Sequence, residues 1–205
     1  MEYSEEFEQL LEKYSHIPYI RPAMLPEINL YMDQVTTFME EHLKSLRRNP
    51  EDKILTKTMI NNYTKNRLLP PPEKKKYSQE HLLLLIYIYY LKSILSIGDI
   101  STLLAPMTER YWEAEDGDRT MRSIYRRLLS LEKEMFRDYQ TDIRKKMDLA
   151  SDFFGKEEMT DDERDYLQNL ALVCELAFDV YLKKQMMETI IDDMKHKKGE
   201  KPSEG

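Results

Sequence analysis

The chain has 205 residues, of which 41% are hydrophobic and 34% charged, and its formal net charge is −7. This composition suits amphipathic helices around a buried core, and the length allows one large domain or two small ones. Because Cys174 is the only cysteine, a disulfide framework is excluded. The five glycines are dispersed, which excludes a glycine-rich phosphate-binding loop.

The N-terminal sequence argues against targeting or membrane insertion. It is acidic, unlike a signal or transit peptide. The most apolar run, residues 82–91, is too short to cross a bilayer and predicts a buried core helix. We therefore expect a soluble, cytoplasmic protein without a membrane partner.

The charges are unevenly distributed along the chain. Between residues 44 and 92, eleven basic residues stand against four acidic ones, a net charge of +7, whereas the rest of the chain carries −14. A basic segment in an acidic protein is typical of one surface that meets an anionic partner such as nucleic acid. The charge pattern alone is equally consistent with a solvated surface that has no partner.

Apolar periodicity and capping residues predict the helices of the first half. We expect a helix at 2–15, a proline-rich connector, and helices at 28–46 and 57–66, the last capped by Thr56. Another helix should run from Ser78 to about Leu95. The Ser96-x-x-Asp99 spacing then predicts a short helix that ends before Pro106.

Two long helices are predicted in the second half, at 119–150 and at 160–195. The whole pattern predicts an all-α, mainly helical fold in four parts. These are an N-terminal helix and connector (1–27), a compact head (28–105), a C-terminal helical domain (106–195) and a disordered tail (196–205).

The short helix at 57–66 has the polar side chains that base edges and phosphates require. Met59, Ile60 and Tyr63 are expected to face the core. Asparagine can pair with adenine, lysine neutralises phosphate, and threonine can do either. The residues of this helix expected to lie at a DNA interface are Lys57, Thr58, Asn61, Asn62, Tyr63 and Lys65.

A proline-braced basic turn follows this helix. Three consecutive prolines exclude a helix, and three consecutive lysines come directly after them. Such a loop beside a recognition helix would lie against the sugar-phosphate backbone. Lys74, Lys75, Lys76 and Tyr77 therefore join the candidate DNA-binding residues.

The order of these features resembles the DNA-binding head of MerR-type regulators. The likeness covers the short helix, the Leu-Leu-Pro-Pro exit, the basic wing ending in Tyr77, the apolar helix and the Ser-Ile-x-Asp-Ile-x-x-Leu-Leu run. The resemblance implies a winged helix-turn-helix over residues 28–105, with Met59–Lys65 as the recognition helix. Arg67 stands where these regulators have a glycine. The chain also resembles an uncharacterised bacterial family known only as a domain of unknown function.

The last helix has an apolar stripe with alternating spacings of four and three residues, which is typical of a helix packed along one partner. A second stripe, which includes Cys174, widens this face. We expect an antiparallel hairpin with the preceding helix, through a stripe from Met121 to Met135, and a homodimer. An intramolecular bundle without self-association is the alternative. Cys174 itself is expected to be a buried packing residue.

We find no motif for catalysis, metal or cofactor binding, so none is expected. The many tyrosines and methionines either fill the core or line a pocket for a small-molecule effector of unknown identity. The sequence predicts a dimeric, sequence-specific regulator of transcription in bacteria that binds double-stranded DNA. The alternative is a helical protein-interaction adaptor that keeps the winged fold without binding DNA.

Overall fold

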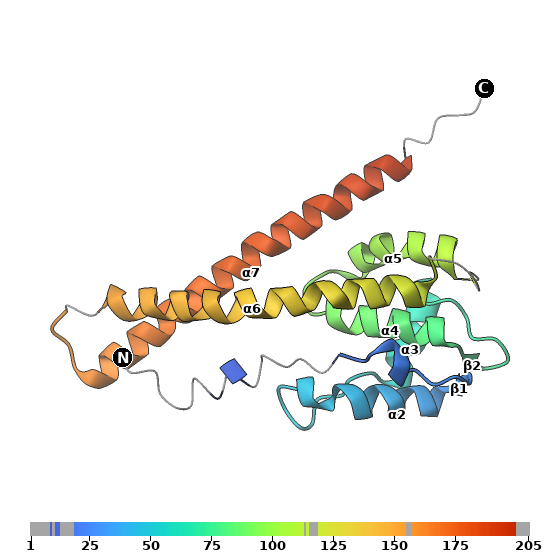
Figure 1. Cartoon of the computed structure of the whole chain (residues 1–205), viewed down its shortest axis with the longest axis horizontal. Helices are drawn as coiled ribbons and strands as arrows, with labels where there is room; N and C mark the ends of the chain where they lie inside the picture. Colours follow the sequence, from blue (N-terminus) through green and yellow to red (C-terminus); the bar gives the residue numbers. More distant parts are fainter. Residues whose placement is uncertain are drawn as a thin grey trace. The chain divides into compact units, whose positions relative to one another are not determined.

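The computed structural model describes residues 9, 11–12, 19–112, 114, 119–154 and 157–199. Most of the helix predicted at 2–15 and the last residues of the tail, 200–205, lie outside this part. The described chain is mainly helical with one two-stranded sheet, which confirms the predicted fold class at this level (Figure 1). No helix in the described ranges is long and apolar enough to cross a membrane.

The chain divides into two compact units. We call residues 18–129 with 188–205 the head unit, and residues 1–17 with 130–187 the arm unit. The head unit contains β1 (Leu30–Tyr31), α2 (Met32–Leu43), α3 (Lys57–Lys65), β2 (Lys76–Tyr77), α4 (Gln79–Leu91), α5 (Ile97–Tyr111), and short 3-10 helices at Pro22–Met24 and Lys44–Leu46. Two long helices, α6 (Met121–Phe153) and α7 (Asp161–Gly199), contribute to both units.

Helix α4 lies at the centre of the head unit. Its residues Leu82–Ile86 are fully buried, as the apolar run predicted. Helix α2 contributes the buried residues Val35, Met39 and Leu43, which recur at the three- and four-residue spacing of one helix face. The core therefore gives the polar surface of α3 a rigid support.

The predicted helix at 28–46 begins later than expected. Leu30 and Tyr31 form β1, which pairs antiparallel with β2 in the register Leu30–Tyr77 and Tyr31–Lys76. Helix α2 then starts at Met32, and the Gln34 side chain accepts a hydrogen bond from the Tyr31 amide at 2.8 Å. Burial of Leu30 against the core favours this strand over another helical turn.

Helix α5 extends beyond its predicted end. Ser96 caps it as predicted, accepting a hydrogen bond from the Asp99 amide at 3.1 Å, but the helix continues through Pro106 to Tyr111. A proline inside a helix costs about 3 kcal/mol. Apolar side chains on both sides of the proline, Leu104 and Met107 among them, lie against the head and offset this cost. Helix α4 ends at Leu91 instead of Leu95, in a turn where the Lys92 ammonium donates to the Ile54 carbonyl at 3.0 Å.

The first turns of α6 and the last turns of α7 belong to the head unit. The buried Tyr125 hydroxyl donates to the Ile20 carbonyl at 2.7 Å, and Met121 is also buried. At the other end, the Lys195 ammonium donates to the Asp99 carboxylate at 3.0 Å. The hydrogen bond from the Ser96 hydroxyl and this bond from Lys195 lower the pKa of Asp99. The compact head therefore extends past the expected boundary at residue 105, and α7 runs past 195.

In the arm unit, α6 and α7 pack through a face other than the predicted one. Ile143 and Met147 of α6 form a buried cluster with Leu11, and Leu172 and Leu176 of α7 pack against it. Of the predicted Met121–Met135 stripe, Met121 is buried in the head unit and Leu131 is exposed, whereas the Met135 side chain lies outside the described part of the chain. Cys174 is exposed, so the expectation that it is buried was wrong.

Candidate nucleic-acid interface

Helix α3 separates a buried face from a polar face. Its start is fixed by Thr56, whose hydroxyl accepts a hydrogen bond from the Met59 amide at 3.2 Å, as predicted. Ile60 and Tyr63 are buried and Met59 is half-buried. The exposed residues are Lys57, Thr58, Asn61, Asn62 and Lys65, which confirms the predicted polar face. With 3.6 residues per turn, Lys57, Asn61 and Lys65 form one row along this face.

The end of α3 places a strained arginine next to this face. The amides of Arg67 and Leu68 donate to the carbonyls of Thr64 and Tyr63 at 3.1 and 2.9 Å, which is the Schellman pattern of helix ends. Arg67 is exposed and has a φ of 57°. Glycine normally occupies this left-handed position, because a Cβ there costs about 1–2 kcal/mol.

The basic turn after the prolines is strained in the same way. The Lys76 amide donates to the Glu73 carbonyl at 2.8 Å, and the two central residues, Lys74 and Lys75, have φ values of 49° and 66°. Two successive residues with positive φ define a type I′ turn, which usually has Asn-Gly at its centre. Both lysines are exposed at its tip. The basic turn was expected, but its tight hairpin geometry was not, since the segment contains no glycine.

Two contacts bring the start of α3 and the base of this turn to the same edge of the head. The Lys57 ammonium forms an ion pair with the Asp33 carboxylate. The Lys76 ammonium lies 5.3 Å from the centre of the Tyr31 ring. Since Tyr31 and Asp33 are two residues apart, both cations lie at the junction of β1 and α2.

The two candidate tyrosines do not lie at the surface. Tyr63 is 7% exposed and Tyr77 is 3% exposed, and burial raises the pKa of both phenols. They are therefore withdrawn from the set of residues expected to contact DNA. Tyr77 instead packs edge-on against the His81 ring, with ring centres 5.3 Å apart.

His81 connects this turn to the core, a role that the sequence did not suggest. Its Nδ1 atom accepts a hydrogen bond from the Ser78 amide at 3.0 Å, and its ring also packs against Trp112. Burial lowers the pKa of His81, against the opposing effects of the Pro71 carbonyl and of Glu80. The ring is therefore neutral in the folded protein at neutral pH, and its unprotonated Nδ1 atom accepts the hydrogen bond from the Ser78 amide.

The head should lose stability in mild acid because of His81. Its folded pKa lies below the unfolded value near 6.5, so below that pH the unfolded chain binds more protons. We expect the His81 contribution to the free energy of unfolding to be constant above this pH and to fall as the pH drops through 6.5 towards the folded pKa. In His81→Gln, glutamine retains the reach back to the Ser78 amide without titrating, so this part of the fall should disappear. Urea unfolding midpoints between pH 5 and 8 test this, and identical pH profiles of the two proteins would contradict it.

Arg67→Gly should stabilise the protein while removing one candidate phosphate contact. Glycine adopts the left-handed conformation without a Cβ clash, so we expect a gain of about 1 kcal/mol in the free energy of unfolding. Arg67→Ala is the matched control, because it removes the same charge and keeps the strain. Urea denaturation measures both variants. Destabilisation by glycine would mean that the arginine side chain is needed for packing.

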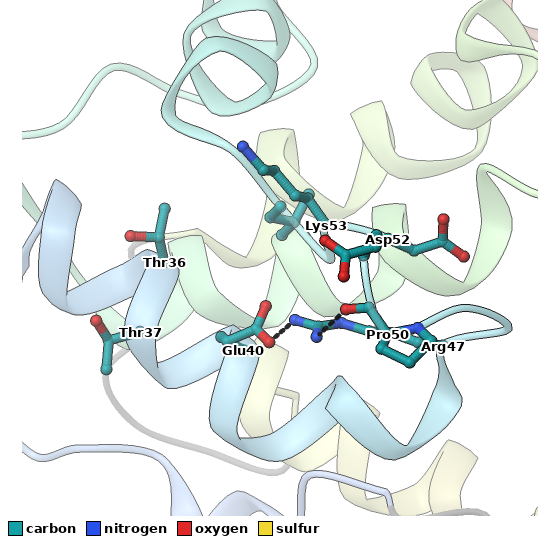
Figure 2. A pocket seen from close by; sticks show the side chains of 9 residues that line it. Thr36, Thr37, Glu40, Arg47, Pro50, Asp52 and Lys53 are labelled. Carbon is teal, nitrogen blue, oxygen red and sulfur yellow. Dashed lines mark hydrogen bonds and ion pairs between the residues drawn. The ribbon is translucent and has the colours of Figure 1, made fainter.

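A polar cavity of about 420 Å³ lies between α2 and the loop that leads to α3. Figure 2 shows the Arg47 guanidinium between the Glu40 carboxylate, its ion-pair partner, and the Pro50 carbonyl, to which it donates at 3.0 Å. The Asp52 carboxylate accepts a hydrogen bond from the Asn49 amide at 3.0 Å and closes the turn. These contacts brace the loop against α2 and fix the point where α3 begins.

A second cavity, of about 460 Å³, lies among α4, α5 and the start of α6. Its walls are mostly apolar, with Tyr87, Met107 and Tyr111 among them, and Arg110 also lines it. It offers space to a small apolar molecule, which was one of the two predicted roles for such residues. Within the described ranges, no three His, Cys, Asp or Glu side chains come together in a way that could hold a metal ion.

Comparison with known proteins places the head in a family. No curated protein and no solved structure matches the chain. One family model, a domain of unknown function (DUF1836), matches residues 20–128. The matched segment begins at the buried Ile20 and ends in α6, so it coincides with the continuous part of the head unit and includes α3 and the basic turn. Because it covers more than half of the 205 residues, the chain belongs to the DUF1836 family.

Proposed function

We propose that the protein is a sequence-specific DNA-binding regulator of transcription, with a head that works as a MerR-like winged helix-turn-helix. In this proposal α2 and α3 form the helix-turn-helix, and α3 enters the major groove. The Glu73–Lys76 hairpin serves as the wing. DNA is the anionic partner that the basic segment of the head meets.

One observation carries the proposal. In the described part of the chain, three residues other than glycine have a positive φ, namely Arg67, Lys74 and Lys75. All three are basic and exposed, and they lie at the end of α3 or at the tip of the turn that follows. Glycine would relieve the strain at each position but would remove the charge. Strain that persists at such positions is typical of functional sites, and here it coincides with positive charge.

The polar face of α3 supports base recognition in addition to phosphate binding. Neither the Asn61 nor the Asn62 amide side chain is held by a hydrogen bond to another described residue, and both are exposed. Lys65, Arg67 and Lys75 likewise form no ion pair with a described carboxylate. A side-chain amide that has no hydrogen-bond partner in the protein can bind a base edge, while the cations on either side of it bind phosphates.

Binding to duplex DNA at several salt concentrations tests the proposal. We expect measurable affinity of the full chain for a labelled random duplex at 50 mM salt, and a steep loss of affinity as salt is raised. Heparin competition and a single-stranded oligonucleotide are the controls. They show whether the protein binds any polyanion as well as it binds duplex DNA. Absence of duplex binding at low salt would reject the proposal and favour the adaptor role.

A further inference from the structure

We propose that the Asp33 carboxylate takes the place of a DNA phosphate in the free protein and thereby weakens the binding of every duplex. The inference rests on the proposed function, because it concerns how strongly the same surface of the head binds DNA. Asp33 lies in the first turn of α2, and nothing in the residues around it points to this surface.

The fold brings Asp33 to a helix that has no acidic residue of its own. Helix α3 contains Lys57 and Lys65 but neither aspartate nor glutamate. The Asp33 carboxylate forms an ion pair with the Lys57 ammonium, and the two side chains are 75% and 59% exposed. In the free protein, the charge of the first cation of α3 is therefore already neutralised.

This ion pair lies at the edge of the surface that is proposed to meet DNA. Lys57 begins the exposed row of α3 that continues with Asn61. Two residues before Asp33, the Tyr31 ring faces the Lys76 ammonium, which lies 5.3 Å from the ring centre. Asp33 is therefore a negative charge at the junction where the start of α3 and the base of the basic hairpin come together.

The start of α2 does not depend on the Asp33 carboxylate. The Gln34 side chain accepts the hydrogen bond from the Tyr31 amide at 2.8 Å, and the Thr36 hydroxyl donates to the main-chain carbonyl of Asp33 at 2.9 Å. Both bonds remain when asparagine replaces Asp33. An ion pair as exposed as this one adds little to stability, as does a carboxylate in the first turn of a helix. The carboxylate therefore matters more for the charge of the surface than for the fold.

Competition between Asp33 and DNA offsets what Lys57 contributes to binding. A cation that contacts a phosphate releases counterions from the DNA, which strengthens binding and makes it more dependent on salt. To make such a contact, Lys57 has to leave Asp33, whose carboxylate then lies unpaired beside the phosphates. When Lys57 keeps the ion pair instead, its charge is not available to the DNA. In both cases Lys57 adds little to the affinity of the wild-type protein.

Asp33→Asn should therefore bind any duplex more tightly than the wild type. With Lys57 released, we expect the slope of log affinity against log salt to be steeper by about 0.9, the value for one phosphate contact. If that contact contributes nothing at 1 M salt, the gain in affinity is about eightfold at 0.1 M and about fourfold at 0.2 M. Two unrelated duplexes should show the same gain, because phosphate contacts carry no sequence information. Fluorescence anisotropy titrations of the full chain measure both quantities.

Two further variants show whether the gain comes from the release of Lys57. Glu41→Gln is the matched control, since Glu41 is exposed on the same helix and its replacement removes the same charge. It lies about 12 Å from Asp33 along the axis of α2, beyond the screening length of about 10 Å at 0.1 M salt, so affinity should not change. In a Lys57→Met background, Asp33→Asn should no longer raise the affinity. Melting temperatures by circular dichroism show that each variant is folded.

The other outcomes overturn the proposal in distinguishable ways. If neither the wild type nor Asp33→Asn binds duplex DNA, the proposed function fails and this inference fails with it. If the wild type binds but Asp33→Asn binds no tighter, the inference alone fails. An equal gain from Glu41→Gln would show an effect of net charge, and an equal gain in the Lys57→Met background would show repulsion by the carboxylate alone.

Discussion

Replacing Lys74, Lys75 and Lys76 together with alanine should weaken binding to every DNA sequence alike. Lys74 and Lys75 lie at the tip of the hairpin and Lys76 at its base. In the proposed complex their ammonium groups contact phosphates, and such contacts carry no sequence information. Each lost phosphate contact lowers the slope of log affinity against log salt by about 0.9. We therefore expect a slope smaller by about 2.7 and an unchanged ratio of specific to random affinity. Fluorescence anisotropy titrations at four or more salt concentrations measure both.

The matched control for this variant removes the same amount of charge elsewhere. Arg126, Lys145 and Lys197 are exposed cations outside the α3 surface, and their replacement by alanine changes the net charge equally. The two triple variants should have similar free energies of unfolding, because alanine keeps the Cβ and hence the strain at positions 74 and 75. If both reduce the salt slope by the same amount, the hairpin has no special part in binding and the attraction is one of net charge.

Asn61→Ala should lose discrimination between the preferred site and random DNA. Asn61 lies between Lys57 and Lys65 in the exposed row of α3, so phosphate contacts on either side would hold its amide over the groove. The amide donates and accepts in a pattern that matches the N6 and N7 edge of adenine. We expect a cost of about 1–3 kcal/mol at the preferred site and almost none on random sequence. Titrations with the two duplexes measure the difference.

Asn62→Ala is the matched control for Asn61→Ala. Asn62 has the same chemistry and is also exposed, but it lies in the neighbouring row with Thr58, which has no lysine, and its carbonyl accepts hydrogen bonds from the Asn66 amide and side chain. We expect a smaller loss of discrimination. Melting temperatures separate binding from stability for both variants. If both lower the melting temperature and neither alters the affinity ratio, the asparagines stabilise the helix end instead of reading bases.

The polar face of α3 and the buried α4 could be predicted because they depend on local pattern. Thr56 and Ser78 are capping residues at the expected places, and apolar spacing identified Ile60 as a core residue. Such signals act within a few residues of the chain. The exposure of Asn61 followed from the same reasoning.

Features that depend on distant contacts could not be predicted. Strand β1 exists because Leu30 pairs with Tyr77, and nothing in the residues around Leu30 indicates this partner. Helix α5 passes through Pro106 because packing on both sides outweighs the local cost. For the candidate site, the left-handed conformations of Arg67 and Lys75 were hidden, since arginine and lysine rarely adopt them.

Selection of bound fragments from random or genomic duplex DNA tests the central claim most directly. We predict enrichment of a defined sequence, with an affinity at least about a thousandfold above that for random DNA at physiological salt. Asn61→Ala should relax the preference at one adenine-containing position of that sequence, while replacement of the three wing lysines should leave the sequence unchanged. Recovery of no common sequence, with equal affinity for all fragments and for the Asn61→Ala variant, would contradict the account.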